Sequence, residues 1–167
     1  MSTRRPTRAA AIVVTAARVA LGLLWLNEGL LKYRAGFGAA DIRLVAESAA
    51  GNGRVPGFYQ WFVTTVLGPG ADLFGIVMPL LECSLGVALI LGILTVPAAL
   101  MSTVTLMMYW LADQLIGEYP VMVLLSVALV AVPAFASRVS LTGVADQLRR
   151  RRNPAAAPIP AALRPWL

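Results

Sequence analysis

Hydrophobic residues form long runs along this chain, separated by short polar segments. Residues 74–111 carry a single charged side chain, that of Glu82. As one helix this run would extend about 57 Å at ~1.5 Å per residue, nearly twice the ~30 Å hydrocarbon core of a bilayer. Gly92, Thr95 and Pro97 lie within it, and residues of these types end one helix and begin the next. The run therefore predicts two membrane-spanning helices.

Two further apolar segments complete the pattern. We expect spans over about residues 9–31, 74–91, 97–111 and 119–135, with a long connection over residues 32–73. The spans predict an all-α, integral membrane four-helix bundle over residues 1–147, followed by a polybasic, Pro/Ala-rich tail over residues 148–167. A cleaved signal peptide is the competing interpretation of the N-terminus. The first apolar stretch is too long for a signal peptide, and no small-residue cleavage site follows it cleanly.

The basic residues set the expected orientation. Nine lie before the first span or after the last: Arg4, Arg5, Arg8, Arg138, Arg149, Arg150, Arg151, Arg152 and Arg164. Four lie in the first connection: Lys32, Arg34, Arg43 and Arg54. This excess places both termini in the cytoplasm and residues 32–73 outside. Together with a mean hydropathy of +0.76, it predicts a multi-pass protein of a bacterial cytoplasmic (plasma) membrane, with the lipid bilayer rather than nucleic acid as its partner.

The outer connection and the tail each allow two interpretations. Residues 39–50 have helical character, Gly51-Asn52-Gly53 ends it, and residues 55–67 are rich in aromatic side chains. Such a segment forms either a short interfacial helix or re-entrant segment, or a loop packed on the bundle. In the tail, Arg149–Arg152 predict an anchor on anionic lipids with a disordered end. The alternative is a docking strand for a cytoplasmic partner.

Polar and small residues recur on one face of the first span. Arg18, Gly22, Gly29 and Lys32 share that face at ~100° per residue. The glycines allow another helix to come close, and Arg18 is long enough to extend toward the cytoplasmic headgroups. Glu28 precedes Lys32 by four residues, a favourable order for an ion pair. This face predicts either simple anchoring of the helix or part of a site.

Glu82 is the main candidate for chemistry, because a carboxylate near mid-bilayer is costly and is usually functional or tightly paired. Gly86 lies on the same helical face. The outer end of the third span adds polar and aromatic side chains, namely Tyr109, Trp110, Asp113 and Gln114. A pocket here could hold a quinone headgroup, with Lys32 or Trp110 donating to a carbonyl oxygen and Glu82 or Asp113 exchanging protons. The alternative is a carboxylate that only locks helices together.

The lack of histidine and the presence of a single cysteine exclude several kinds of chemistry. The chain contains no histidine, which excludes imidazole haem ligation, imidazole metal sites and histidine general-base catalysis within it. Its one cysteine, Cys83, cannot form an intrachain disulfide or a dithiol motif. We therefore expect no metal and no covalently bound cofactor, and a membrane quinone is the one candidate ligand.

Several of these residues together resemble the DoxX/DoxD-like family of small four-helix membrane proteins. The first span matches an Arg-x3-Gly…Gly-x2-Lys pattern through Arg18, Gly22, Gly29 and Lys32. Residues 79–95 resemble the family's glutamate, its glycines (Gly86 and Gly92) and its threonine turn, and residues 140–146 resemble its closing element. Val96 departs from the basic residue that usually follows this turn.

The resemblance implies a membrane subunit in redox chemistry. The best-defined members of the family are subunits of a thiosulfate:quinone oxidoreductase. By this resemblance, Glu82 and Lys32 correspond to the family's recurrent polar residues. The usual partner is a second, DoxA-type subunit. The chain has no evident haem, iron–sulfur or flavin motif, so a partner protein must supply the electrons.

Three functions fit the sequence. The first is a subunit that passes electrons from a membrane or extracytoplasmic redox protein to the quinone pool. The second is a non-catalytic accessory or anchor subunit of a respiratory complex. The third, a small transporter, fits less well because the spans show no inverted repeat or paired broken helices.

Overall fold

The structure is a computed structural model that describes residues 8–114, 117–137, 139–160 and 162–167. Arg4, Arg5 and Arg138, which contribute to the charge pattern, lie outside these ranges. The regular structure of the described residues is entirely helical, which confirms the all-α class. Its elements are α1 (Arg8–Ala35), α2 (Ala39–Ala50), α3 (Gly57–Phe62), the π-helical turn η1 (Val63–Leu67), α4 (Ala71–Leu91), α5 (Thr95–Leu111), α6 (Tyr119–Ala131), α7 (Pro133–Ala136), α8 (Leu141–Arg152) and the 3₁₀ turn η2 (Arg164–Trp166).

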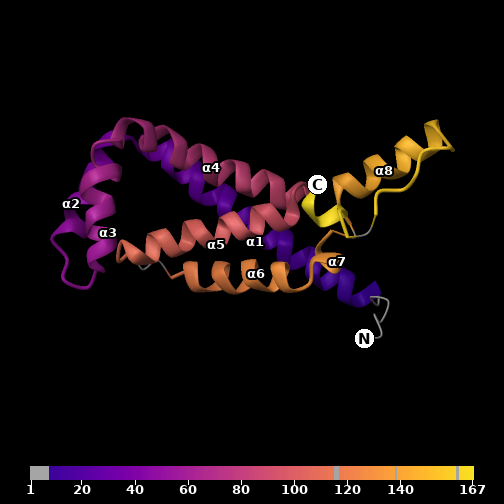
Figure 1. The fold of residues 1–167 in the computed structure, drawn as a ribbon, viewed down its shortest axis with the longest axis horizontal. Coiled ribbons are helices and arrows are strands. Elements are labelled where there is room, and N and C mark those ends of the chain that lie inside the picture. The colour runs from indigo at the N-terminus through magenta and orange to yellow at the C-terminus, as the bar shows by residue number, and fades with distance from the viewer. Residues whose placement is uncertain (1–7, 115–116, 138, 161) are drawn as a thin grey trace.

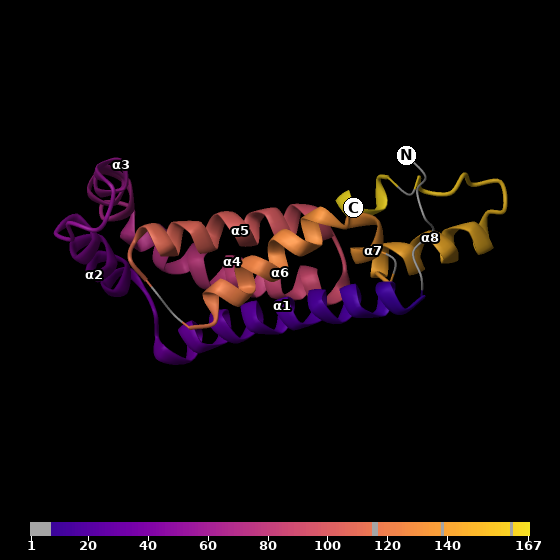
Figure 2. The same ribbon diagram turned by 90° about the horizontal axis from the view of Figure 1, so that it is seen from below.

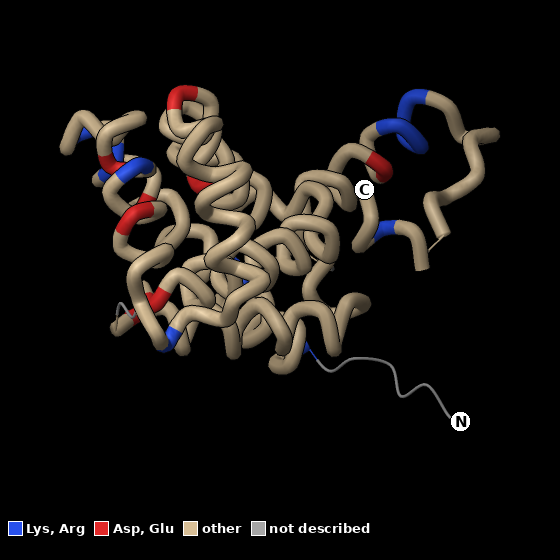
Figure 3. The backbone as a smooth tube through the Cα atoms, turned by 60° about the vertical axis from the view of Figure 1, so that its left-hand side comes forward, with Lys and Arg blue, Asp and Glu red and all other residues tan. Residues whose placement is uncertain are grey.

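Helices α1, α4, α5 and α6 lie side by side (Figures 1 and 2). We call α2, α3 and η1, which sit together at one end of these helices, the cap. The start of α1 and all of α7 and α8 lie at the opposite end, which we call the tail end. Charged residues gather in the cap and in α8, with mostly uncharged chain between them (Figure 3). The long helices therefore separate two polar regions.

The outward faces of the long helices are apolar. Among the described residues, α1 and α4 are long and apolar enough to cross a membrane, whereas α5 and α6 are shorter apolar helices. Their exposed side chains include Leu23, Ile76, Leu80, Val104 and Leu124. Soluble monomers rarely expose an apolar surface of this extent. The surface between the two ends is suited to contact with lipid.

Glycines set the distance between α1 and α4, the most extensively packed pair of helices. A Cβ atom on Gly86 would lie 2.7 Å from the backbone nitrogen of Leu26, and one on Gly22 would lie 2.9 Å from the carbonyl oxygen of Gly86. A Cβ on Gly29 would lie 2.5 Å from the sulfur of Cys83. Real side chains do not fit at these distances, so the two backbones meet directly. This is the small-residue packing typical of membrane helices.

A series of buried hydrogen bonds joins α1, α5 and α6. The indole nitrogen of Trp25 on α1 donates to the hydroxyl of Ser102 on α5 at 2.7 Å. Ser102 in turn shares a 2.7 Å hydrogen bond with Ser126 on α6, which donates to the carbonyl of Met122. Trp25, Ser102 and Ser126 thus each have a hydrogen-bond partner, as a low-dielectric interior favours. These hydrogen bonds fix which face α1, α5 and α6 each turn toward the others.

At the tail end, Arg18 turns inward and does not reach toward headgroups. It is 2% exposed, and its guanidinium donates to the carbonyls of Ala136 and Val139 at 2.8 Å each. It also lies against Gly92, where it leaves no room for a Cβ atom. Gly92 has φ +70°, and the chain turns there from α4 into α5, with the half-buried Pro97 in the first turn of α5. Two backbone carbonyls that follow α6 therefore bind the Arg18 guanidinium inside the protein, which explains the difference.

The tail folds back on itself around Asp146. This buried carboxylate accepts from Arg149 at 3.2 Å, from Arg164 at 3.1 Å and from the backbone N–H of Ile159 at 3.3 Å. Burial opposes the charge of Asp146, but these hydrogen bonds and the neighbouring arginines lower its pKa below the usual value. The turn η2 then packs on α5 and α7. The described part of the tail is therefore folded, in contrast to the disordered end that the sequence indicated.

We predict that Gly86→Ala destabilises the protein by about 1–3 kcal/mol, the usual cost of overpacking a tight interface. The added methyl group would meet backbone atoms of α1, and these cannot move aside as a flexible side chain could. The matched control is Gly57→Ala, because a Cβ at Gly57 meets nothing within 4 Å. Thermal unfolding in mild detergent measures both variants. Equal midpoints for the two would show that the α1–α4 contact does not limit stability.

Candidate functional site

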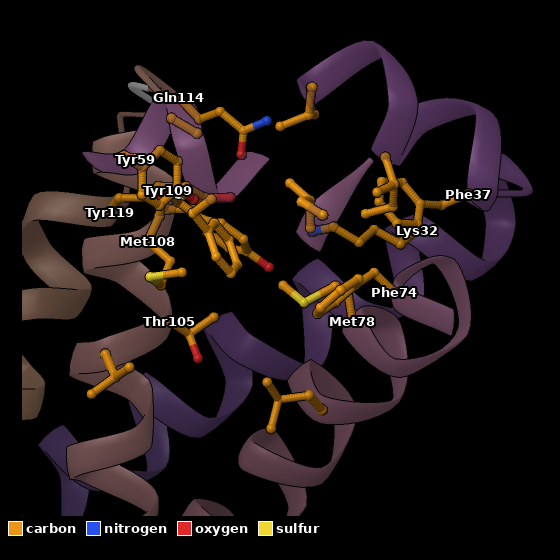
Figure 4. A pocket seen from close by; sticks show the side chains of 17 residues that line it. Lys32, Phe37, Tyr59, Phe74, Met78, Thr105, Met108, Tyr109, Gln114 and Tyr119 are labelled. Carbon is orange, nitrogen blue, oxygen red and sulfur yellow. Dashed lines mark hydrogen bonds between the residues drawn. The ribbon is translucent and has the colours of Figure 1, made fainter. Parts of the chain in front are cut away.

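A cavity of about 490 Å³ lies between the cap and the cap-side halves of the long helices. Figure 4 shows its labelled side chains converging from opposite sides of this space. Its lining is Lys32, Phe37, Ile42, Val45, Tyr59, Phe62, Leu67, Phe74, Met78, Leu81, Val104, Thr105, Met108, Tyr109, Ala112, Gln114 and Tyr119. The volume falls within the range of small-molecule sites, ~300–1,000 Å³.

Most of the lining is apolar, and two of its polar groups are already committed. Thr105 donates to the carbonyl of Met101 at 2.9 Å within α5. Tyr59 on α3 donates to the carbonyl of Met108 at 2.8 Å and so ties the cap to α5. Burial raises the pKa of Tyr59 to about 12, so this phenol keeps its proton at ordinary pH. The polar lining residues that remain are Lys32, Tyr109, Gln114 and Tyr119.

Lys32 and Tyr109 both bind Glu82, which lies behind them. The ammonium of Lys32 on α1 is 2.7 Å from Oε1 of Glu82 on α4. The hydroxyl of Tyr109 on α5 donates to the same oxygen at 2.5 Å. Glu82 is fully buried, and its other oxygen, Oε2, has no hydrogen-bond partner among the described residues. Charge-assisted bonds of this kind are the strong ones in a low-dielectric interior.

A second carboxylate extends this cluster toward the surface. Glu28 Oε2 lies 3.5 Å from the ammonium of Lys32 and accepts from Tyr119 on α6 at 3.4 Å. The rings of Tyr109 and Tyr119 stack with centroids 5.4 Å apart. The Glu28 side chain is 16% exposed, whereas that of Glu82 is fully buried. One ammonium thus stands between a buried and a partly exposed carboxylate.

Lys32 retains capacity for a ligand. Its ammonium has three N–H donors, of which two are directed at Glu82 and Glu28. The nitrogen also lies 5.8 Å from the ring centroid of Phe37 and 5.6 Å from that of Tyr109. These aromatic faces stabilise the cation at the cavity wall. The remaining donor can bind an oxygen atom of a molecule in the cavity.

Three of the seven predicted site residues line the cavity, and the other four do not. Lys32, Tyr109 and Gln114 line it, while Glu82 and Glu28 lie behind Lys32. Trp110 is 61% exposed and does not line it. A one-residue step of ~100° around α5 separates Trp110 from Tyr109 and turns the indole away.

Asp113 has a different position from the one that the sequence indicated. It lies outside the cavity lining and fastens the cap to the end of α5. It accepts from the side-chain nitrogen of Asn52 at 2.8 Å and pairs with Arg54 at 2.9 Å. Its φ of +60° is a conformation that aspartate tolerates better than most residues do. Asp113 therefore helps to close the cavity.

Much of the cavity wall consists of residues that the sequence pattern did not indicate. Phe37 and Tyr59 come from the outer connection, Met78 from α4, and Tyr119 from the start of α6. The aromatic run around Tyr59 was visible as an interfacial signal. Nothing in its spacing indicated that one of its rings would close a cavity. Tyr119 follows a separate loop, so its contact with Glu28 depends on how α6 packs against α1.

Fold and site together describe an all-helical membrane protein with a capped, mostly apolar cavity. The family model named DoxX matches residues 13–113, and the chain belongs to the DoxX family. The match runs from α1 to the residue after the α5 C-cap and includes Lys32, Glu82 and Tyr109. No curated protein and no solved structure matches the chain.

We predict that Lys32→Met destabilises the protein by about 3–5 kcal/mol, because it leaves Glu82 buried without a cation. The double variant Lys32→Met/Glu82→Gln should recover most of that loss. The control is Arg43→Met, which breaks the exposed Arg43–Asp72 pair and should cost no more than about 1 kcal/mol. Unfolding in mixed micelles measures these free energies. A double variant no more stable than Lys32→Met would contradict the importance of the buried pair.

Proposed function

We propose that this protein is the membrane subunit of a quinone-linked redox assembly and that it passes electrons from a partner protein to the membrane quinone pool. The cavity is the proposed quinone site. The observation that carries the proposal is the cluster at its wall. There, an ammonium and a phenol converge on one buried carboxylate at the wall of a mostly apolar cavity.

These residues suit the reduction of a quinone, which takes up two electrons and two protons to form a quinol. Lys32 donates its free N–H to one quinone oxygen, which polarises the carbonyl as negative charge develops. The phenol oxygen of Tyr109 accepts a hydrogen bond from the product hydroxyl. The two electrons come from the redox centre of the partner protein, and the two protons come from the aqueous phase.

Glu82 and Glu28 are the proposed proton carriers. Glu82 contacts both Lys32 and Tyr109, so either group can exchange a proton with it. Glu28 contacts Lys32 and is the most exposed carboxylate of the cluster, so it connects the cluster to water. General acid–base groups must lie within hydrogen-bond reach of the reacting group or of each other, and these do.

The charge distribution supports an orientation for this reaction. We place the protein in a bacterial plasma membrane, with the cap outside and the tail end in the cytoplasm, because the arginine-rich α8 lies at the tail end. The cavity then lies near the outer surface. An extracytoplasmic redox protein would reach it at the cap.

An accessory or anchor subunit is the second candidate. It is favoured by the exposed apolar side chains of the cap, Leu44, Phe58 and Trp61, which offer a docking surface. In that case the Lys32–Glu82 pair only holds helices together. The two candidates differ in one measurable respect, because an anchor subunit copurifies with redox proteins but retains no quinone.

We predict that Glu82→Gln lowers quinone reduction by about a hundredfold or more, the usual contribution of a proton-transferring group. Glutamine preserves the size of the side chain but cannot exchange a proton. The assay uses protein purified in mild detergent with its copurifying partners, thiosulfate as the donor and decylubiquinone as the acceptor. The matched control is Glu47→Gln, an exposed position on α2.

Quinone extraction and mass spectrometry of the same preparations complete this test. Wild type should retain quinone, and Glu82→Gln should keep its partner proteins. Unchanged turnover in Glu82→Gln would remove Glu82 from the reaction. Wild-type protein with neither bound quinone nor copurifying redox proteins would contradict the proposed function.

The tail supports a separate proposal, that anionic lipids bind at Arg149–Arg152. Asp146 forms ion pairs with Arg149 at 3.2 Å and with Arg150 at 3.8 Å. The exposed Arg151 and Arg152 therefore remain to bind lipid phosphates.

We predict that the double variant Arg151→Gln/Arg152→Gln retains fewer anionic lipids through purification than wild type, as counted by native mass spectrometry. Arg34→Gln/Arg43→Gln, which removes two exposed cationic charges from the cap end, is the control and should retain as many as wild type. Equal retention by both double variants would place the lipid contacts elsewhere.

A further inference from the structure

The cavity has one exposed wall residue. Of the 17 described residues that line it, Val104 alone is exposed, at 56%, and the others are buried or half-buried. A side chain that borders both the cavity and the outer surface marks the mouth of the cavity. Val104 lies seven residues before Leu111, the last residue of α5, or about 10 Å along the helix. The mouth is therefore on the side of the long helices and not at their end.

The surface around this mouth is apolar. Leu100, Met101 and Met107 are exposed on the same side of α5 as Val104. Across the mouth, Met78 and Leu81 on α4 line the cavity, and their neighbours Val77 and Leu80 are exposed. The long helices pack mainly as α1 on α4 and as α5 on α6, and α4 packs much less on α5. The α4–α5 seam is therefore one of the less tightly packed seams, and Met78, Leu81 and Val104 line the cavity on its two sides.

The opposite end of the cavity is closed by the cap. Tyr59 is bonded to the backbone of α5, and Asp113 holds Asn52 and Arg54. Apolar cap residues that include Ile42 and Leu67 are buried against the cavity. The polar cluster of Lys32 and Tyr109 lies on this closed side, since Tyr109 is near the end of α5 and Lys32 is near the end of α1. The ammonium of Lys32 and the phenol of Tyr109 therefore lie at the closed side of the cavity, whereas the exposed residues around its opening are apolar.

We infer that the ligand reaches the cavity sideways from the bilayer, between α4 and α5 at Val104, and that it carries a long apolar tail which stays in that opening. The compact polar head lies at Lys32 and Tyr109. A volume of about 490 Å³ suits a ring and the first part of a tail but leaves the remainder in lipid. The inference rests on the proposed function and narrows its substrate to a long-tailed, lipid-soluble quinone.

The test compares two quinones with the same headgroup. Decylubiquinone carries a ten-carbon tail, and 2,3-dimethoxy-5-methylbenzoquinone carries none. Binding of each to the full chain in lipid nanodiscs is measured at equal quinone per lipid, after subtraction of protein-free nanodiscs. The variant is Val104→Trp, whose ring takes the place proposed for the tail, and binding is measured at equilibrium so that slower entry alone changes neither affinity. The matched control is Val127→Trp, at a 51% exposed position on α6 that does not line the cavity.

We expect Val104→Trp to weaken decylubiquinone binding by about tenfold or more, which corresponds to about 1.4 kcal/mol or more. Binding of the tail-less quinone should change by less than about twofold, and Val127→Trp should change neither. Undiminished decylubiquinone binding in Val104→Trp would overturn the inference. Equal weakening of both quinones would also overturn it, because Val104 would then lie beside the headgroup. If wild type binds neither quinone, the proposed function itself fails.

A second measurement tests the mouth without any quinone. A spin label is attached at V104C in a Cys83→Ala background, and its exposure to dissolved oxygen and to a water-soluble nickel chelate is measured in nanodiscs. A lipid-facing mouth gives high exposure to oxygen and little to the chelate, whereas E47C in the cap gives the reverse. A label at V104C as open to the chelate as one at E47C would overturn the inference, even with quinone binding intact.

Discussion

The ion pair between Lys32 on α1 and Glu82 on α4 joins two helices whose backbones touch. Without a cation, a fully buried carboxylate would destabilise the bundle by several kcal/mol. Lys32 reaches Glu82 because Gly22, Gly29 and Gly86 remove the side chains that would hold the helices apart. The position of this pair then sets the rest of the site, since Tyr109 and Glu28 are bound through Glu82 and Lys32.

The two ends of the bundle use buried charge differently. At the cap end, Glu82 and Lys32 border a cavity, and the charge is shared with Tyr109 and Glu28. At the tail end, Arg18 is surrounded by protein, and its guanidinium is bound by two backbone carbonyls. The first cluster leaves donor capacity free beside an open space, whereas the second closes the turn at Gly92. The proposed chemistry therefore lies at the cap end, whereas the buried charge at the tail end joins segments of the protein to one another.

The cavity has the ammonium of Lys32 and the phenol of Tyr109 at its closed side and an apolar side opening. The cap provides the closure, because Tyr59 and Asp113 fix it to α5. The opening results from the pairwise packing of α1 with α4 and of α5 with α6, which leaves the seam between α4 and α5 loosely packed. A water-soluble ligand has no such path, since the apolar faces that surround the mouth would be covered by lipid. The same packing that stabilises the bundle thus selects the kind of molecule that can reach the Lys32–Tyr109 side.

Hydrophobic runs, turn residues and glycine spacing alone were enough to predict an all-helical membrane chain. They also singled out Glu82, because a lone carboxylate in a long apolar run violates a strong energetic rule. Those signals are local, and each can be read within one helix. The partner of Glu82, the closing role of Asp113 and the outward turn of Trp110 could not be read in this way. They depend on how α1, α4, α5 and the cap rotate against one another. Helix rotation is set by contacts between residues far apart in the chain, such as Trp25 with Ser102 and Tyr119 with Glu28, and only the tertiary structure brings those residues together.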